Sequence, residues 1–199
     1  MGAQLLETGF IARDVNERDF VIGPALRAMD FDALNRGALR GLRHEVLAEL
    51  VAQVGETCNL TTLDGAAVLY LDRVEAPWPW RLTLAVGEHV PLHCTASGKL
   101  FLAVMPPEQG ETLITQLTLK RMTDGTLTSM IALRAECETI AKAGYSLDHG
   151  EFIAGLIALA VPVRDANGEV RAALAVHSPQ ARLTQSQLVG TQRPTVCEA

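Results

Sequence analysis

A run of four small residues is the strongest candidate ligand site in the sequence. Thr95, Ala96, Ser97 and Gly98 precede an apolar stretch with helical spacing, so they stand where a helix is expected to begin. The first turn of a helix presents unpaired N–H groups and a partial positive charge, and small side chains let a ligand approach them. This arrangement suits a carboxylate. The alternative is an ordinary Ser or Thr cap with close packing of the helix on a sheet.

A second polar group lies in the segment GYSLDHGEF, residues 144–152. Asp148, His149 and Glu151 stand where one expected strand ends and the next begins, and side chains at such positions can point into a cavity. The alternative is a turn exposed to solvent. His177, at the end of the last expected strand, is a third candidate, because an imidazole can donate or accept a hydrogen bond. The alternative there is a structural histidine.

The sequence lacks the usual signatures of catalysis. It contains no G-x-S-x-G, no G-x-x-x-x-G-K-[ST] and no H-E-x-x-H. His89, His93 and Cys94 are close enough in sequence to be metal ligands, and Cys58 with His149 could form a thiol–imidazole pair by tertiary contact. The four cysteines form no C-x-x-C, which argues against a zinc site or a disulfide framework. We therefore expect reduced thiols, no catalytic residues, no metal and no cofactor, and a protein that is not an enzyme.

The composition is that of a globular protein with an acidic surface. The chain has 199 residues, of which 48% are hydrophobic and 20% are charged, and such a chain can form a buried core. Its formal charge of -6 argues against a basic nucleic-acid binder. No apolar run reaches the roughly 18 residues that a membrane span needs, and the N-terminus has no signal-peptide pattern. We expect a cytoplasmic protein with no membrane partner.

The first part of the chain predicts a small hairpin followed by helix. Two short apolar runs, 9–14 and 20–23, are joined by a polar segment, which is typical of two paired strands. Pro24 then begins a helical stretch, where its missing N–H costs nothing. Leu26 and Met29 near this start would be exposed on a lone helix and favour pairing with another chain.

The remainder of the chain alternates between strand and helix patterns. The pair Asp64-Gly65 between two β-rich runs predicts a hairpin. The pattern predicts an α+β fold with an antiparallel sheet of five or six strands and helices on its faces. The expected strands cover 57–63, 67–76, 80–87, 151–163 and 169–177, the expected helices 37–54, 93–105, 108–117, 130–143 and 185–188, and residues 191–199 form an expected polar tail.

Several segments together resemble the IclR-type family of bacterial transcription regulators. They are GFIARDVNERDFVIGPAL, TCNLTTLDGAAVLYLDRVE, VGEHVPLHCTASGKLFLA, GYSLDHGEF and AVPVRDANGEVRAALAVHSPQARLT, in the family's order over about residues 4–188. The resemblance implies a winged helix-turn-helix followed by a GAF-like effector-binding domain. It also implies a homodimer or homotetramer that binds a small organic or aromatic acid to control transcription.

The resemblance further implies which residues bind the effector. In the family, the pocket is lined by the small-residue loop before the Gly-Lys pair, by the acidic residue of the G-Y-x-x-D block, and by the strand after it. The hairpin partner of that strand often carries small hydroxyl residues, whereas this chain has Ala175 and His177 there. At the matching positions of this sequence the ligand-binding residues are Thr95, Ala96, Ser97, Gly98, Asp148, Leu156, Ala158 and His177.

The resemblance divides the chain into a wing remnant (1–23), a linker helix (24–36), a GAF-like effector-binding domain (37–190) and a tail (191–199). DNA binding is expected only through a missing N-terminal domain, because residues 1–52 carry six Arg against eight Asp and Glu. Two other functions stay open: a stand-alone small-molecule sensor or interaction domain without DNA contact, and a thiol or metal enzyme in the same cavity.

Overall fold

The computed structural model describes residues 2–13, 19–35, 38–78 and 84–198. The chain divides into two units, Met1–Arg43 and His44–Ala199. Helix α3 (Ala38–Val54) spans this division. The domain boundaries that the family resemblance implies stay predictions.

The N-terminal unit contains a short helix, a hairpin and a longer helix. α1 (Gly2–Glu7) leads into β1 (Ile11–Arg13), which pairs antiparallel with β2 (Phe20–Ile22). α2 (Pro24–Asn35) then begins at proline, whose missing N–H would be unpaired there anyway. Gly23 allows the chain to pass close to itself, since a Cβ there would lie 2.1 Å from the carbonyl oxygen of Gly9. The predicted hairpin and first helix are confirmed.

The C-terminal unit is built on a six-stranded antiparallel sheet with the order β5-β4-β3-β8-β7-β6. Gly65 lies in the turn between β3 and β4 with a φ of 59°, in the left-handed region that glycine adopts without strain. The α+β class, the antiparallel sheet and the flanking helices are confirmed. The strands are β3 (Thr57–Asp64), β4 (Ala67–Val74), β5 (His89–Pro91), β6 (Ser146–His149), β7 (Leu156–Arg164) and β8 (Val170–Pro179).

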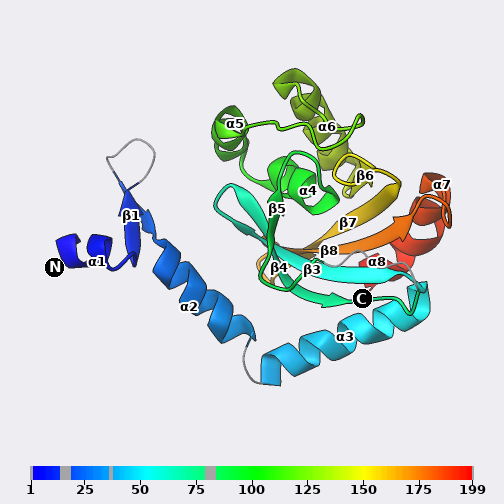
Figure 1. Cartoon of the computed structure of the whole chain (residues 1–199), viewed down its shortest axis with the longest axis horizontal. Coiled ribbons are helices and arrows are strands. Elements are labelled where there is room, and N and C mark those ends of the chain that lie inside the picture. The colour runs from blue at the N-terminus through cyan, green and yellow to red at the C-terminus, as the bar shows by residue number, and fades with distance from the viewer. Residues whose placement is uncertain (1, 14–18, 36–37, 79–83, 199) are drawn as a thin grey trace. The chain divides into compact units, whose positions relative to one another are not determined.

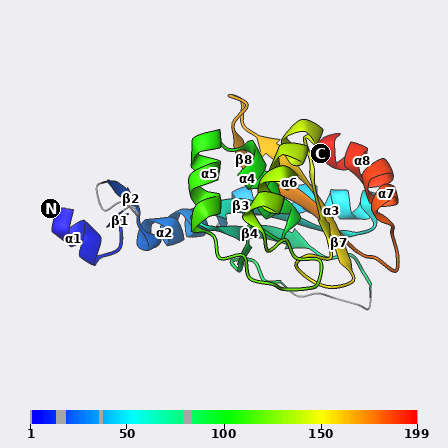
Figure 2. The ribbon, with the colours of Figure 1, turned by 90° about the horizontal axis from the view of Figure 1, so that it is seen from above.

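Helices cover both faces of this sheet (Figure 1). α4 (Ala96–Val104) and α6 (Met130–Ala143) lie over one face, with α5 (Pro107–Gln116) beyond α4. Seen from above, α4 and α6 overlie the strands and α3 lies beyond them (Figure 2). The second face is covered by α3 and by a C-terminal helical segment that comprises α7 (Gln185–Gln187), the π-helical η1 (Leu188–Gln192) and α8 (Arg193–Glu198).

The alternation of side chains along β7 separates two cores. Ala158 and Ala160 pack with Leu100 on the side of α4, which we call the α4 face. Ile157 and Leu159 belong to the core on the side of α3. The α4 face of β7 and β8 therefore carries alanines where the α3 face carries large branched side chains, so α4 can lie close to the sheet.

Two expected strands differ in the structure. Of the strand expected at 80–87, residues 80–83 lie outside the described residues and residues 84–87 are not extended in a strand. Among the described residues, the strand that follows β4 is β5, in which Val90 pairs with Val68. The strand expected from residue 151 begins only at Leu156, because the preceding residues form a turn with Gly155 at a φ of 79°.

The C-terminal end also differs from the expected polar tail. Residues Arg193–Glu198 form α8, and Val196 is 2% exposed in the same core as the fully buried Leu188. The polar residues around Pro194 gave no sign in the sequence that Val196 packs in the core. Proline does not prevent the helix, because it is tolerated in the first turn.

Candidate functional site

Three of the predicted ligand-binding residues lie side by side on three neighbouring strands. Asp148 on β6 is paired with Ala158 on β7, and Ala158 is paired with His177 on β8. Thr57 on β3 pairs with His177 and continues the row. Because paired residues of a sheet project to the same side, all four belong to the α4 face. Leu156, two residues before Ala158 on β7, belongs to it as well.

The small-residue loop is the start of α4, as its residue types predict. Thr95 Oγ1 accepts the N–H of Gly98 at 3.1 Å and donates to the carbonyl oxygen of Pro91 at 2.8 Å. Gly98 packs tightly on the preceding strand segment, since a Cβ there would lie 2.3 Å from the carbonyl oxygen of Leu92. Thr95 and Gly98 therefore have structural roles in this loop. Ala96 and Ser97 are 2% and 5% exposed, and a ligand-binding role for the loop stays a prediction.

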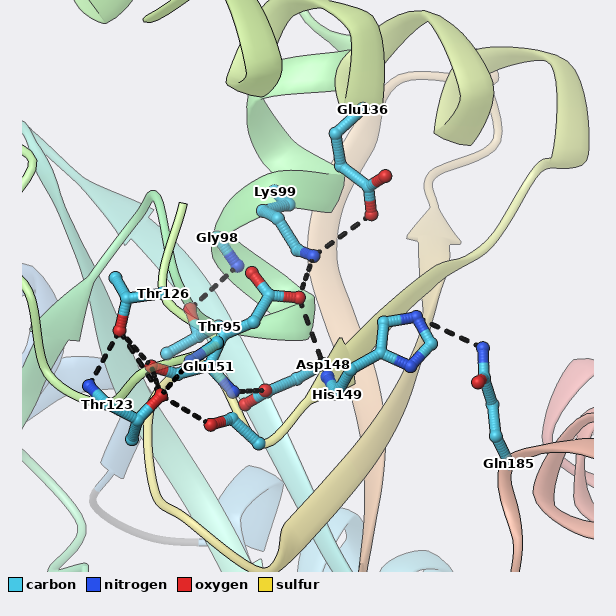
Figure 3. Close-up of polar contacts among 12 residues, drawn as sticks. Thr95, Gly98, Lys99, Thr123, Thr126, Glu136, Asp148, His149, Glu151 and Gln185 are labelled. Carbon is cyan, nitrogen blue, oxygen red and sulfur yellow. Dashed lines mark hydrogen bonds and ion pairs between the residues drawn. The ribbon is translucent and has the colours of Figure 1, made fainter. Parts of the chain in front are cut away.

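A buried ion cluster next to this loop was missed by the sequence analysis (Figure 3). Lys99 is fully buried, and its Nζ lies 2.5 Å from Oε1 of Glu151 and 3.0 Å from Oε1 of Glu136. The lysine comes from α4, Glu136 from α6 and Glu151 from the turn between β6 and β7. This cluster joins three elements around the α4 face, because a buried ammonium is stable only when carboxylates neutralise it.

The acidic turn is buried, so the solvent-exposed alternative is wrong for it. Asp148 and Glu151 are 3% and 4% exposed, and Asp148 Oδ1 accepts the N–H of Glu151 at 2.7 Å. Burial, with a smaller contribution from the charge of Glu151, raises the pKa of Asp148 to about 7. Thr123 and Thr126 donate to the backbone carbonyls of Gly150 and Glu151, both at 2.6 Å, which ties the turn to the preceding loop.

His149 does not join this buried group. It lies at the exposed end of β6, where its Nε2 contacts the amide nitrogen of Gln185 at 3.0 Å (Figure 3). A thiol–imidazole pair with Cys58 is not formed, because Cys58 packs in the core on the α3 face. Burial also raises the pKa of Cys58 and of Cys94 to about 12, so both thiols stay protonated and weakly nucleophilic at neutral pH.

The metal alternative finds no support in the described residues either. No group of three or more His, Cys, Asp or Glu side chains in that part of the chain could hold a metal ion. His89 lies 2.8 Å from Oδ2 of Asp64, and His93 lies 2.9 Å from the carbonyl oxygen of Lys120. The histidines near Cys94 are thus bonded to separate partners.

A cavity of about 340 Å³ lies where β3 and β7 begin and where β4 and β8 end. Of the predicted ligand-binding residues, Leu156 and His177 line it, whereas Thr95–Gly98, Asp148 and Ala158 do not. The complete lining is Glu56, Thr57, Arg73, Glu75, Ala76, Trp78, Ile153, Ala154, Gly155, Leu156, His177, Pro179 and Arg182. Its volume is in the range of small-molecule sites, and apolar side chains and a few charged groups share the wall.

Arg182, one of the residues that line the cavity, is held by two protein partners. Nη2 of Arg182 lies 2.9 Å from Oε1 of the buried Glu56, and its guanidinium lies 3.6 Å from the centre of the Trp78 ring. Trp78 in turn donates its indole N–H to the carbonyl oxygen of Gly55 at 2.9 Å. The ion pair with Glu56 and the cation–π contact with Trp78 together fix the position of the Arg182 side chain.

A second arginine, Arg73 on β4, and His177 on β8 also line the cavity. Arg73 donates from Nη1 to Oδ1 of Asn59 at 2.9 Å. Burial, and to a lesser degree the charge of Arg73, lowers the pKa of His177 to about 3, so its imidazole is neutral. Sequence analysis singled out His177 but neither arginine. No local signal marks them, since Arg182 meets Glu56 across 126 positions of the chain.

Comparison with known proteins places this geometry in a family. Residues 31–198 match the family model described as bacterial transcriptional regulator IclR C-terminal. The chain belongs to the IclR family of bacterial transcriptional regulators. It is 41% identical to the probable transcriptional regulator SauR of Cupriavidus necator over 187 residues, which are 94% of this chain and 74% of that protein. It is 28% identical to the transcriptional repressor IclR of Escherichia coli over 92% of this chain and 67% of that protein.

Solved structures of IclR-family proteins share the fold. IclR of Thermotoga maritima superimposes with a TM-score of 0.77 and 29% identity over 99% of this chain and 79% of that one. The inducer-binding domain of PobR from Acinetobacter, solved as a double mutant with 3-hydroxybenzoic acid, gives a TM-score of 0.74 and 28% identity over 81% of this chain and 95% of that one. The fold of the C-terminal unit is thus that of an IclR effector-binding domain.

Proposed function

We propose that this chain is the sensing part of an IclR-family regulator and that its effector is a small organic acid bound on the α4 face of the sheet. The observation that carries the proposal is the 340 Å³ cavity at the end of that face, which is lined by His177 and two arginines. The row of Asp148, Ala158, His177 and Thr57 leads from the buried turn to this cavity. The 3-hydroxybenzoic acid complex of PobR, a structural neighbour, supports an acid as the ligand.

A contact between β4 and α3 connects a strand that lines the cavity with the helix that leads from the first unit. Asp72, the neighbour of Arg73 on β4, lies on the α3 side of the sheet, and its Oδ1 is 3.0 Å from Nδ1 of His44. His44 belongs to α3, the helix that spans the division between the two units. We infer that a ligand which shifts β4 changes the position of α3, and that an N-terminal DNA-binding domain responds to it.

We also propose that the protein forms a homodimer or homotetramer. Leu26 and Met29 on α2 are 37% and 56% exposed, which favours a homodimer or homotetramer over a monomer. None of the described helices is both long and apolar enough to cross a membrane.

A ligand panel tests the proposed sensing function. Lactate, pyruvate, 3-hydroxybenzoate and hexanoate are titrated while thermal unfolding is followed. At least one hydroxy, keto or phenolic acid is expected to raise the midpoint by about 5–10 °C at a hundredfold excess over its Kd, while hexanoate has no effect. The preference is expected because the neutral imidazole of His177, which lines the cavity, can form a hydrogen bond with a ligand hydroxyl or carbonyl group, and the chain of hexanoate has neither. No shift with any acid of the panel would contradict the proposal.

A further inference from the structure

We propose that Glu56 accepts a hydrogen bond from a hydroxyl group of the effector in the 340 Å³ cavity, and that it thereby selects hydroxy acids over acids of the same shape without a hydroxyl. The inference rests on the proposed function and assigns a chemical role to one residue of the lining. It goes beyond a preference for acids, because it states which functional group of the ligand the cavity distinguishes.

Arg182 occupies one carboxylate oxygen of Glu56 and leaves the other without a partner. Nε and Nη2 of Arg182 both contact Oε1 of Glu56, at 3.0 Å and 2.9 Å. Oε2 forms no hydrogen bond or ion pair with another described residue, and it is not fully enclosed by the protein, in contrast to Oε2 of Glu151. Because Glu56 lines the cavity, this oxygen is the acceptor that the residue offers to a ligand.

The second oxygen of Glu56 needs a donor. The side chain is 3% exposed, so water solvates the carboxylate poorly. A buried carboxylate is stable when donors satisfy both of its oxygens, and Arg182 satisfies only one. An ionised carboxylate accepts hydrogen bonds but donates none, so it can bind a hydroxyl group but not a keto oxygen or a fluorine atom. The bond is also stronger than one between two neutral groups.

Protein contacts fix the position of this acceptor. Trp78 donates its indole N–H to the carbonyl oxygen of Gly55 at 2.9 Å, which holds the chain next to Glu56. The guanidinium of Arg182, which contacts Oε1 of Glu56, lies 3.6 Å from the centre of the Trp78 ring. A side chain that is held in this way needs little ordering when the ligand binds, and this favours discrimination between similar ligands.

The charge of Glu56 is compatible with an acid as the ligand. Arg182 neutralises the carboxylate at 2.9 Å, so the pair carries no net charge. An acid group on another part of the ligand therefore meets little repulsion from Glu56.

His177 cannot make the same distinction. It pairs with Thr57, the residue after Glu56, and it also lines the cavity. Its imidazole is neutral, and a neutral imidazole donates from one ring nitrogen and accepts at the other. It can therefore bond to a hydroxyl or to a keto group, whereas the carboxylate of Glu56 can bond only to a donor.

The rest of the lining fits the apolar body of a small hydroxy acid. The apolar part comes from the end of β4, the turn before β7 and the end of β8, and consists of Ala76, Ile153, Ala154, Leu156 and Pro179 with the Trp78 ring. A volume of about 340 Å³ is at the small end of the range for ligand pockets. The cavity thus suits a hydroxy acid with one ring or a short chain.

The test compares ligands that differ in one functional group. Calorimetric titration of the full chain uses 3-hydroxybenzoate against 3-fluorobenzoate, whose fluorine is similar in size to a hydroxyl but has no proton to donate, and lactate against pyruvate. We expect the hydroxy acid of at least one pair to bind about 10-fold or more tightly, because its partner leaves the buried carboxylate oxygen without a donor. Alanine, with an ammonium group in place of the hydroxyl of lactate, is expected to bind more weakly than lactate, since Arg182 already balances the charge of Glu56.

Variants of Glu56 assign the preference to its carboxylate. In Glu56→Gln the amide oxygen can keep the contact with Arg182, which places the amide NH₂ at the position of Oε2 and removes the acceptor. The hydroxy acid is then expected to bind within about 3-fold of its partner, since only a neutral hydrogen bond remains. Glu56→Asp keeps the negative charge but moves the carboxylate back by one methylene group, and is also expected to lose most of the preference. Glu169→Gln, at an exposed glutamate between β7 and β8 that does not line the cavity, is the matched control and keeps the wild-type ratio.

The possible outcomes separate this inference from the proposed function. Acids that bind with no preference for a hydroxyl overturn the inference and leave the sensing function intact. A preference that persists unchanged in Glu56→Gln and Glu56→Asp assigns the hydroxyl to another residue and also overturns it, as does tighter binding of alanine than of lactate. If no probe binds the wild-type chain, both the inference and the proposed function are contradicted. If Glu56→Gln does not fold, Glu56→Asp, which keeps a negative partner for Arg182, gives the decision.

Discussion

Nζ of Lys99 lies 2.5 Å from Oε1 of Glu151, and both side chains are buried. This pair joins α4 to the turn that follows β6 and Asp148, and Glu136 of α6 also contacts Nζ of Lys99, at 3.0 Å. The relative position of α4 and the sheet thus depends on an ion cluster as well as on apolar packing. Removal of the lysine would leave two carboxylates without their neutralising charge.

Lys99→Met is therefore expected to lower the free energy of unfolding by about 3–5 kcal/mol, because it leaves Glu151 as an uncompensated buried charge. Urea unfolding measures the change. Lys142→Met, at an exposed lysine near the end of α6, is the control and is expected to stay within about 0.5 kcal/mol of the wild type. A loss of less than about 1 kcal/mol for Lys99→Met would show that the cluster is not needed for the fold.

Asp148 is expected to make stability depend on pH. Its pKa is raised from 3.8 to about 7, so between these values the folded protein holds a proton that the unfolded chain has released. The free energy of unfolding should therefore fall as pH rises from about 4 to about 7, and Asp148→Asn should reduce this fall. Asp124→Asn, at an exposed carboxylate, is the control. Parallel pH profiles for Asp148→Asn and the wild type would refute the expectation.

The tight approach of Gly98 to Leu92 predicts opposite effects for two glycine substitutions in helices. A Cβ at Gly98 would lie 2.3 Å from the carbonyl oxygen of Leu92, whereas a Cβ at Gly41 of α3 meets nothing within 4 Å. Gly98→Ala is expected to destabilise the protein by about 1–3 kcal/mol, and Gly41→Ala to stabilise it by up to about 1 kcal/mol. Thermal unfolding distinguishes the two. Equal effects would mean that Gly98 tolerates a side chain.

Exposed apolar residues on α2 predict self-association. Leu26→Lys combined with Met29→Lys is expected to shift the light-scattering mass at high micromolar concentration from a dimer or tetramer to a smaller species. Ile131→Lys, at the 78% exposed position on α6, serves as the comparison for added charge. A monomeric wild-type chain would contradict this prediction.

Local signals in the sequence predicted those features that depend on neighbouring residues. The Thr95 cap, the Asp64-Gly65 turn and the helix start at Pro24 each depend on the chemistry of one or two residues. The order of strand and helix patterns predicted the α+β class, and the family resemblance supplied Asp148 and His177 as candidate ligand-binding residues. Their proximity across three strands needs long-range pairing, which no local pattern gives.

The features that the sequence did not predict depend on tertiary contact. Lys99 is charged, and its complete burial depends on Glu136 and Glu151, which lie 37 and 52 positions away. Arg73 and Arg182 become cavity residues only because the ends of β4 and β8 lie close together around it. β5 has only three residues, too few for an alternating pattern to stand out.

Chemical-shift mapping of the ¹⁵N-labelled chain with 3-hydroxybenzoate and with lactate tests the central claim most directly, because it reports where an acid binds as well as whether it binds. The account predicts saturable shifts of the backbone amides of Thr57, Arg73 and His177 on the α4 face, with smaller changes at Leu50 and Val176 in the core on the α3 face. Saturable shifts centred on the α3 face, or no shifts up to the solubility limit of both acids, would contradict it.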